Sequence, residues 1–90
     1  MFKYTPSVLE KLETLLGEAD YVVRYEKGNF KAGYCLLKDK RVIVVNKYYN
    51  TESRINCFLE LMPKLDLREE NLSDGSHKLL KQIKAPAAQP

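Results

Sequence analysis

The sequence has few of the side chains from which catalytic and metal sites are commonly built. Its 90 residues include one histidine, two cysteines and four glycines. Cys35 and Cys57 lack the short paired spacing of a zinc site, and His77 is expected to be solvated or to cap a helix. No Gly-x-Gly-x-x-Gly or Gly-Lys-Ser/Thr loop is present to hold a nucleotide phosphate. We therefore expect no enzyme activity, no metal and no cofactor.

Long apolar runs and export signals are also missing. The chain does not open with a basic segment followed by an apolar one, and its apolar runs are far shorter than a membrane span. Two cysteines inside apolar runs are not the pattern of a disulfide-stabilised secreted scaffold, so both are expected to be buried and reduced. These features predict a cytoplasmic protein that does not associate with membranes.

The composition is that of a chain with one folded domain. Hydrophobic residues make up 44% of the sequence and charged residues 30%, which is typical of globular rather than disordered proteins. At this length one apolar core is all that the chain can build. The last stretch, Ala85 to Pro90, has nothing to bury. We expect one domain over residues 1–84 and a flexible tail over residues 85–90.

The first segment has the spacing of an amphipathic helix. Thr5 is a preferred N-cap residue, and Pro6 follows at the first helical position, where its missing N–H costs nothing. Gly17 stands where a left-handed residue would end the helix. The apolar residues at helical spacing are Val8, Leu9, Leu12, Leu15 and Leu16.

Two further helices are expected in the second half of the chain. Asn50 or Thr51 can cap the first of them, and Pro63 must end it because an interior proline clashes with the preceding turn. Ser73 and Asp74 can cap the last helix. The segment between these two helices favours at most a short helical turn.

Three strands are expected between the first and second helices. Residues 21–26 alternate between apolar and polar, residues 30–37 form a second strand, and residues 41–46 form a third that is apolar on both faces. Short turns at 27–29 and 38–40 join them, and sequential strands with short connections favour an antiparallel meander. The predicted fold class is α+β: a helix, a three-stranded antiparallel meander, then two or three helices, in the order αβββαα.

The strand region is basic and contains tyrosines. Between Tyr21 and Tyr49 there are seven basic and two acidic residues, although the whole chain has a net charge of only +3. Such a surface could neutralise phosphates and stack bases, or it could be a solvated face whose lysines protect strand edges from aggregation. The candidate binding residues are Arg24, Lys31, Lys38, Lys40, Arg41, Lys47, Tyr48 and Tyr49.

The segment from Arg41 to Pro63 has a recognisable order of elements. A strand ends at Asn46, Arg54 lies near a helix start, and the helix continues into Leu-Glu-Leu-Met-Pro at 59–63. This order resembles the core of the ImmA/IrrE-type zinc peptidases, in which such a helix carries His-Glu-Leu-Gly-His. The resemblance implies a peptidase-like scaffold without its zinc site, because Leu59 and Pro63 have no donor atoms. The alternative is a capped amphipathic helix that packs Leu59 into the core.

These observations favour a small domain that acts by binding. We predict a protein-interaction or self-associating module that uses the exposed side of its sheet, since short chains often complete their core by oligomerising. Nucleic-acid binding through the basic residues is one alternative. A peptidase-like fold that has kept only peptide binding is the other.

Overall fold

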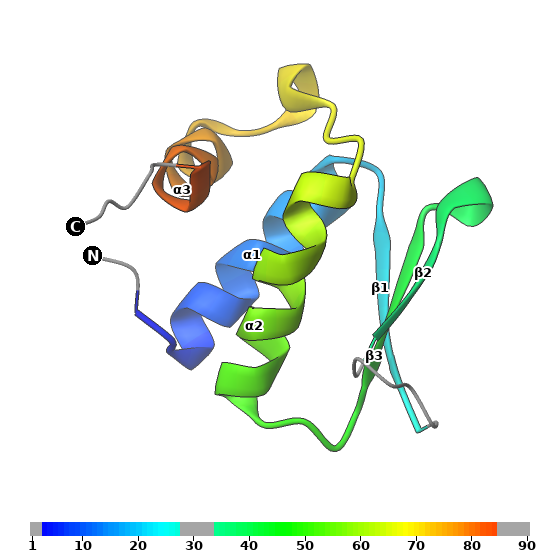
Figure 1. Ribbon diagram of the computed structural model, residues 1–90. Coiled ribbons are helices and arrows are strands. Elements are labelled where there is room, and N and C mark those ends of the chain that lie inside the picture. The colour runs from blue at the N-terminus through cyan, green and yellow to red at the C-terminus, as the bar shows by residue number, and fades with distance from the viewer. Residues whose placement is uncertain (1–2, 28–33, 85–90) are drawn as a thin grey trace.

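The computed structural model describes residues 3–27 and 34–84 (Figure 1). The predicted tail at 85–90, part of the turn at 27–29, and the start of the second strand at 30–33 lie outside these residues. The elements, in chain order, are α1 (Pro6–Glu18), β1 (Val22–Glu26), β2 (Tyr34–Leu37), the 3₁₀ turn η1 (Lys38–Lys40), β3 (Val42–Asn46), α2 (Thr51–Leu61), the 3₁₀ turns η2 (Met62–Lys64) and η3 (Glu69–Asn71), and α3 (Asp74–Lys84).

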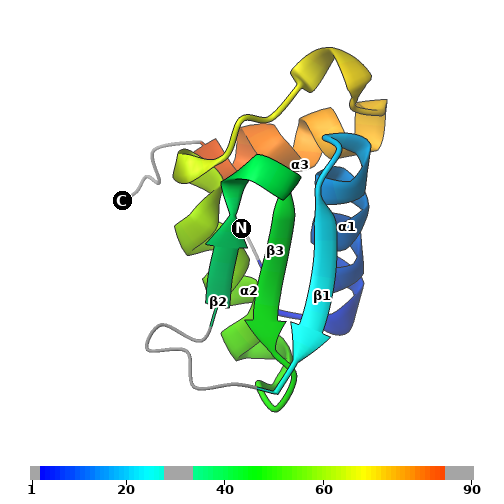
Figure 2. The same ribbon diagram turned by 90° about the vertical axis from the view of Figure 1, so that its right-hand side faces the viewer.

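The α+β class is confirmed, but the antiparallel meander is wrong. The strand order in the sheet is β1-β3-β2, so the last strand in sequence lies in the middle (Figure 2). β3 runs antiparallel to β2 and parallel to β1, which makes the sheet mixed. The register pairs Val22 with Val42 on one side of β3 and Leu37 with Val42 on the other.

The apolar content of β3 explains its central position. Ile43 and Val45 are fully buried, and Val44 is only 8% exposed although it points to the other face. A strand that is apolar on both faces is best shielded when it has a neighbour on each side, and continuous apolar runs are typical of such strands. The apolar run is visible in the sequence, but sequential strands usually pair with each other, and this tendency favoured the antiparallel meander.

The described helices all lie on one side of the sheet. α1 and α2 lie side by side against that face, and α3 packs on α1 away from the sheet (Figures 1 and 2). The core between these layers contains Leu12, Leu15, Ile55 and Phe58, all fully buried. Burial of apolar area contributes roughly 25 cal/mol per Å², so this is the side of the sheet on which the fold depends.

Local capping signals set most helix boundaries as expected. The Thr5 hydroxyl accepts a hydrogen bond from the Val8 N–H at 3.2 Å, and the Asn50 side chain accepts one from the Ser53 N–H at 2.8 Å. The prediction for Gly17 is wrong. This residue lies inside α1, and the left-handed turn comes later at Asp20, with a φ of 69°.

The later elements also follow their sequence signals. α2 ends at Leu61, and Pro63 falls in the 3₁₀ turn that follows it. The expected short turn before the last helix is η3, and α3 begins at Asp74. The described part of the chain contains no helix with both the length and the apolar character needed to cross a membrane.

The two cysteines differ in environment. Both are thiols rather than halves of a disulfide, but Cys57 is buried whereas Cys35 is only partly buried. The expectation that both are interior is therefore wrong for Cys35. The reason is that Cys35 pairs with Val44 on the sheet face opposite the described helices.

Candidate functional site

The uncovered side of the sheet is the principal candidate site. Side chains alternate along each strand, and Val23, Tyr25, Tyr34, Leu36, Ile43 and Val45 pack toward the helices. The intervening residues point away from the helices. We call this surface the open face, and its outward residues are Val22, Arg24, Glu26, Cys35, Leu37, Val42, Val44 and Asn46.

Apolar side chains form a row across the open face. Val22, Val42 and Leu37 are neighbours in the strand register, so the row extends from one edge strand to the other. Val22 is 54% exposed and Leu37 is 44% exposed. The solvent face of a sheet is expected to carry polar residues, and this row carries none. Figure 2 looks onto this side of the sheet.

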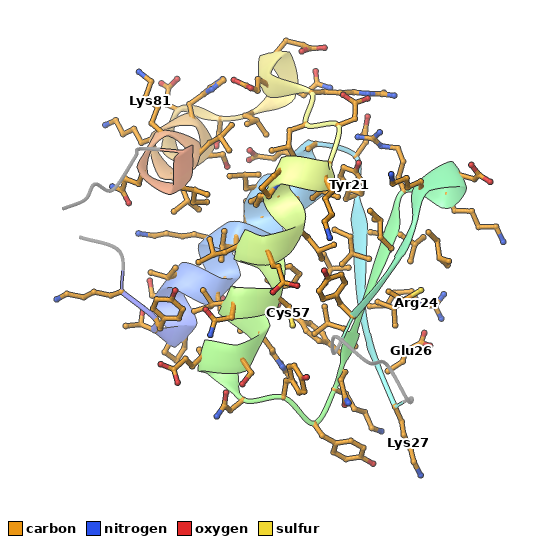
Figure 3. All side chains as sticks on the ribbon, viewed as in Figure 1. Tyr21, Arg24, Glu26, Lys27, Cys57 and Lys81 are labelled. Carbon is orange, nitrogen blue, oxygen red and sulfur yellow. The ribbon has the colours of Figure 1, made fainter. Side chains whose placement is uncertain are left out.

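The open face has a pair of opposite charges next to the apolar row. Arg24 and Glu26 are two residues apart on β1, and their side chains form an ion pair at 2.8 Å. Both point away from the helices in Figure 3. The pair is solvent-exposed and therefore contributes little to stability, but it leaves no net charge on β1.

The structure separates the basic residues that the sequence grouped together. Lys38 and Lys40 lie in η1 at one end of the sheet, whereas Lys47 follows β3 at the opposite end. Arg24 lies on the open face and pairs with Glu26. Lys31 is outside the described residues. Two separated groups of cations replace the single basic surface that the sequence suggested.

Arg41 is partly buried and bonded to the rest of the fold. Its Nη2 donates to the carbonyl oxygens of Ala19 at 2.6 Å and Asp66 at 2.8 Å, and its Nε donates to the Asp20 carbonyl at 3.2 Å. The guanidinium also lies over the Tyr21 ring, 4.2 Å from its centroid. Arg41 thus satisfies carbonyls at the end of α1 that have no partner within the helix.

A left-handed backbone conformation directs Arg41 to these partners. Its φ is 52°, and it ends the turn η1. Tyr21 completes the contact, because its hydroxyl accepts a hydrogen bond from the Asp66 N–H at 3.0 Å. A residue chosen from the sequence as a binding cation therefore joins three segments of the chain, an outcome that its spacing did not indicate.

The two tyrosines before α2 also have different environments. Tyr48 is 69% exposed, and the Lys47 ammonium lies 5.5 Å from its ring. Tyr49 is half-buried against the core. Arg54 fixes this loop by donating to the Tyr49 carbonyl at 2.9 Å and the Lys47 carbonyl at 2.8 Å. Tyr48 therefore stays accessible, while Tyr49 belongs to the fold.

The segment that resembles the zinc-peptidase helix forms the end of α2 and the turn η2. Leu59 packs on the core, Glu60 is exposed, and Pro63 lies in η2. The Glu60 carboxylate accepts a hydrogen bond from the Tyr34 hydroxyl at 2.9 Å. Across residues 3–27 and 34–84, no three His, Cys, Asp or Glu side chains are grouped so that they could hold a metal ion.

Two titratable groups between the sheet and α2 are shifted by their surroundings. Burial raises the pKa of the Cys57 thiol, and the nearby Glu60 carboxylate adds to this shift. Burial also raises the pKa of Tyr25, whose hydroxyl donates to Glu13, and the Arg54 guanidinium lies 4.2 Å from the Tyr25 ring. Both shifts favour the neutral form, so neither group is activated as a nucleophile.

A shallow groove of about 390 Å³ lies on the opposite side of the molecule, between α1 and α3. The residues that line it include Glu10, Lys11, Lys78 and Gln82, together with Leu79. The described side chains that line it form no convergent set of catalytic groups. It is a less specific candidate than the open face.

Comparison of the chain with models of protein families, with curated proteins and with solved structures gave no match. The resemblance to ImmA/IrrE-type peptidases therefore stays a prediction from the sequence.

Proposed function

We propose that this protein is a small non-catalytic interaction module that binds a protein partner through the open face. We further propose that it acts in the cytoplasm. The single observation that carries the proposal is the apolar row Val22, Val42 and Leu37, whose two outer residues are exposed and whose central residue is partly buried, on a sheet whose other side is already covered by helices. Contiguous exposed apolar patches mark interaction sites, whereas scattered apolar residues do not.

Nucleic-acid binding receives less support from the geometry. Arg41 is bound to backbone carbonyls, Arg24 is paired with Glu26, and the remaining lysines lie at two ends of the sheet. Single-stranded nucleic acid is typically bound by a continuous basic groove beside stacking aromatic rings. Tyr48 with Lys47 is a local combination of this kind, but it stands at one end of the sheet.

The proposal can be tested by affinity capture from the protein's own cells. The wild type is compared with the double variant Val22→Lys/Leu37→Lys, with and without nuclease treatment. We expect a protein partner that survives nuclease and is lost from the double variant, because two ammonium groups in an apolar contact are costly to desolvate. Both positions are exposed, so the variant should keep its fold.

A matched control adds the same charge elsewhere. Asn56 on α2 and Gln82 on α3 are exposed, and Asn56→Lys/Gln82→Lys should capture the same partner as the wild type. A partner that is retained equally by all three proteins would contradict the proposal. Recovery of nucleic acid, with loss of bound proteins after nuclease, would instead favour the nucleic-acid alternative. Charge reversal at Lys38 and Lys40 should then abolish the binding.

A further inference from the structure

The shape of the apolar row favours a partner with the same row. Val42 lies on the central strand, with Val22 on one edge strand and Leu37 on the other. The next row, Arg24, Val44 and Cys35, again has its central residue on β3. If a two-fold axis ran parallel to β3 between two copies, each row would face the same row of the second copy in reverse order. Val42 would then face Val42 of a second copy, and Val22 would face Leu37.

The charge of the open face also suits a second copy. The chain has a net charge of +3, but the outward residues of the sheet carry one positive and one negative charge, and these are paired at 2.8 Å. Two such faces do not repel each other. The lysines Lys38, Lys40 and Lys47 lie at the ends of the sheet, where they can stay solvated around an apolar contact.

The arrangement matches a common way of packing sheets. Two sheets that pack face to face align their strands within about 30° and lie about 10 Å apart. β-Branched residues such as Val22, Val42 and Val44 suit such a contact, because they pack well on a pleated surface. The helices α1 and α2 would stay on the outside of both copies, since they cover the opposite face of each sheet (Figure 1).

We infer that a second copy of this chain covers the open face, giving a two-fold dimer with the layer order helices, sheet, sheet, helices. This inference rests on the proposed function and names its partner. The sheet is about 10 Å wide and about 17 Å long, from two strand spacings and five residues. This projected area of about 170 Å² is about a fifth of the roughly 800 Å² per partner of a standard interface, so the dimer should be reversible and weak, forming only toward millimolar concentration.

Sedimentation of the purified chain tests the inference. As the concentration rises from about 10 μM to about 1 mM, we expect the mass to increase from 10.4 kDa toward twice that value. Val22→Lys/Leu37→Lys should weaken the dimer at least about tenfold, because it places cations in a desolvated contact. The control Asn56→Lys/Gln82→Lys should dimerise like the wild type.

Salt gives a second readout. An apolar, neutral contact should be unaffected or strengthened when the salt concentration is raised from about 0.1 M to about 1 M, whereas a contact made by the lysines should weaken. A chain that stays monomeric up to the highest concentration would overturn the inference. So would a dimer that ignores the double variant, or one that salt dissociates.

The failure of the dimer can be told apart from the failure of the proposed function. If the chain is monomeric but still captures a nuclease-resistant partner that Val22→Lys/Leu37→Lys loses, the open face binds a different protein. If neither dimer nor partner depends on these residues, the open face has no binding role.

Discussion

The two faces of the sheet are built from the same three strands but have different roles. On the covered face, Ile43 and Val45 are fully buried between the strands and the helices. On the open face, Val22 of β1 is 54% exposed and Leu37 of β2 is 44% exposed. The contrast shows that the apolar content of this sheet exceeds what its own helices can cover. Stability depends on the first face, and the second is the one that we propose to bind a partner.

The largest expected effect is on the covered face. Phe58→Ala removes a fully buried ring, and we expect it to lower the free energy of unfolding by about 3–5 kcal/mol. That is a large part of the total stability of a domain this small. Urea denaturation followed by circular dichroism would measure it. Val22→Ala, measured below the dimerisation range, should change stability by less than about 1 kcal/mol. Equal losses of unfolding free energy in the two variants would show that the two faces contribute equally to stability.

A smaller effect is expected from the polar contacts that hold the end of α1. Arg41→Lys removes the planar group that donates to the Ala19, Asp20 and Asp66 carbonyls and lies over Tyr21. A point charge cannot replace this geometry, so we expect a loss of about 1.5–3 kcal/mol in thermal unfolding. Lys40→Ala, on the neighbouring exposed residue, is the control. An unchanged melting temperature for Arg41→Lys would show that these contacts do not stabilise the fold.

The smallest effect concerns pH. Glu18 accepts hydrogen bonds from the N–H of Ser73 at 3.0 Å and from its hydroxyl at 3.2 Å. Hydrogen bonds from Ser73 and Ser76 lower the pKa of this carboxyl from its ordinary value of 4.5. The charged form is therefore favoured by folding. Its contribution is present above about pH 4.5 and is lost as the pH falls through the lower pKa of the folded state.

The measurement is the stability of Glu18→Gln against pH. The variant should be less stable than the wild type near neutral pH by no more than about 1 kcal/mol, because water screens a partly exposed carboxylate. This difference should shrink as the medium is acidified below about pH 4.5. A constant difference across the whole range would show that the carboxylate charge has no part in the contact.

Local signals in the sequence predicted the elements well. Thr5 and Asn50 cap their helices as expected, and Pro63 follows the end of α2. Each of these signals acts over three or four residues. Gly17 is the local exception, because α1 extends past it to Glu18. A glycine permits a left-handed turn but does not require one.

The candidate site was predicted less well. The sequence directed attention to basic and aromatic residues, whereas the open face is defined by Val22, Val42 and Leu37. Consecutive apolar residues at the edge strands, such as Val22-Val23 and Leu36-Leu37, were the available signal, because one member of each pair must face away from the core. Whether that member is exposed depends on which face the helices cover.

The sequence alone determined the element types, the helix starts and the α+β class, because capping and periodicity act within a few residues. The tertiary structure decided the strand order, the role of Arg41 and the exposure of the apolar row. These depend on contacts between distant residues, such as β1 with β3 and Arg41 with Ala19 and Asp66. The central position of β3 follows from shielding its two apolar faces at once, a requirement that belongs to the whole sheet and to no single segment.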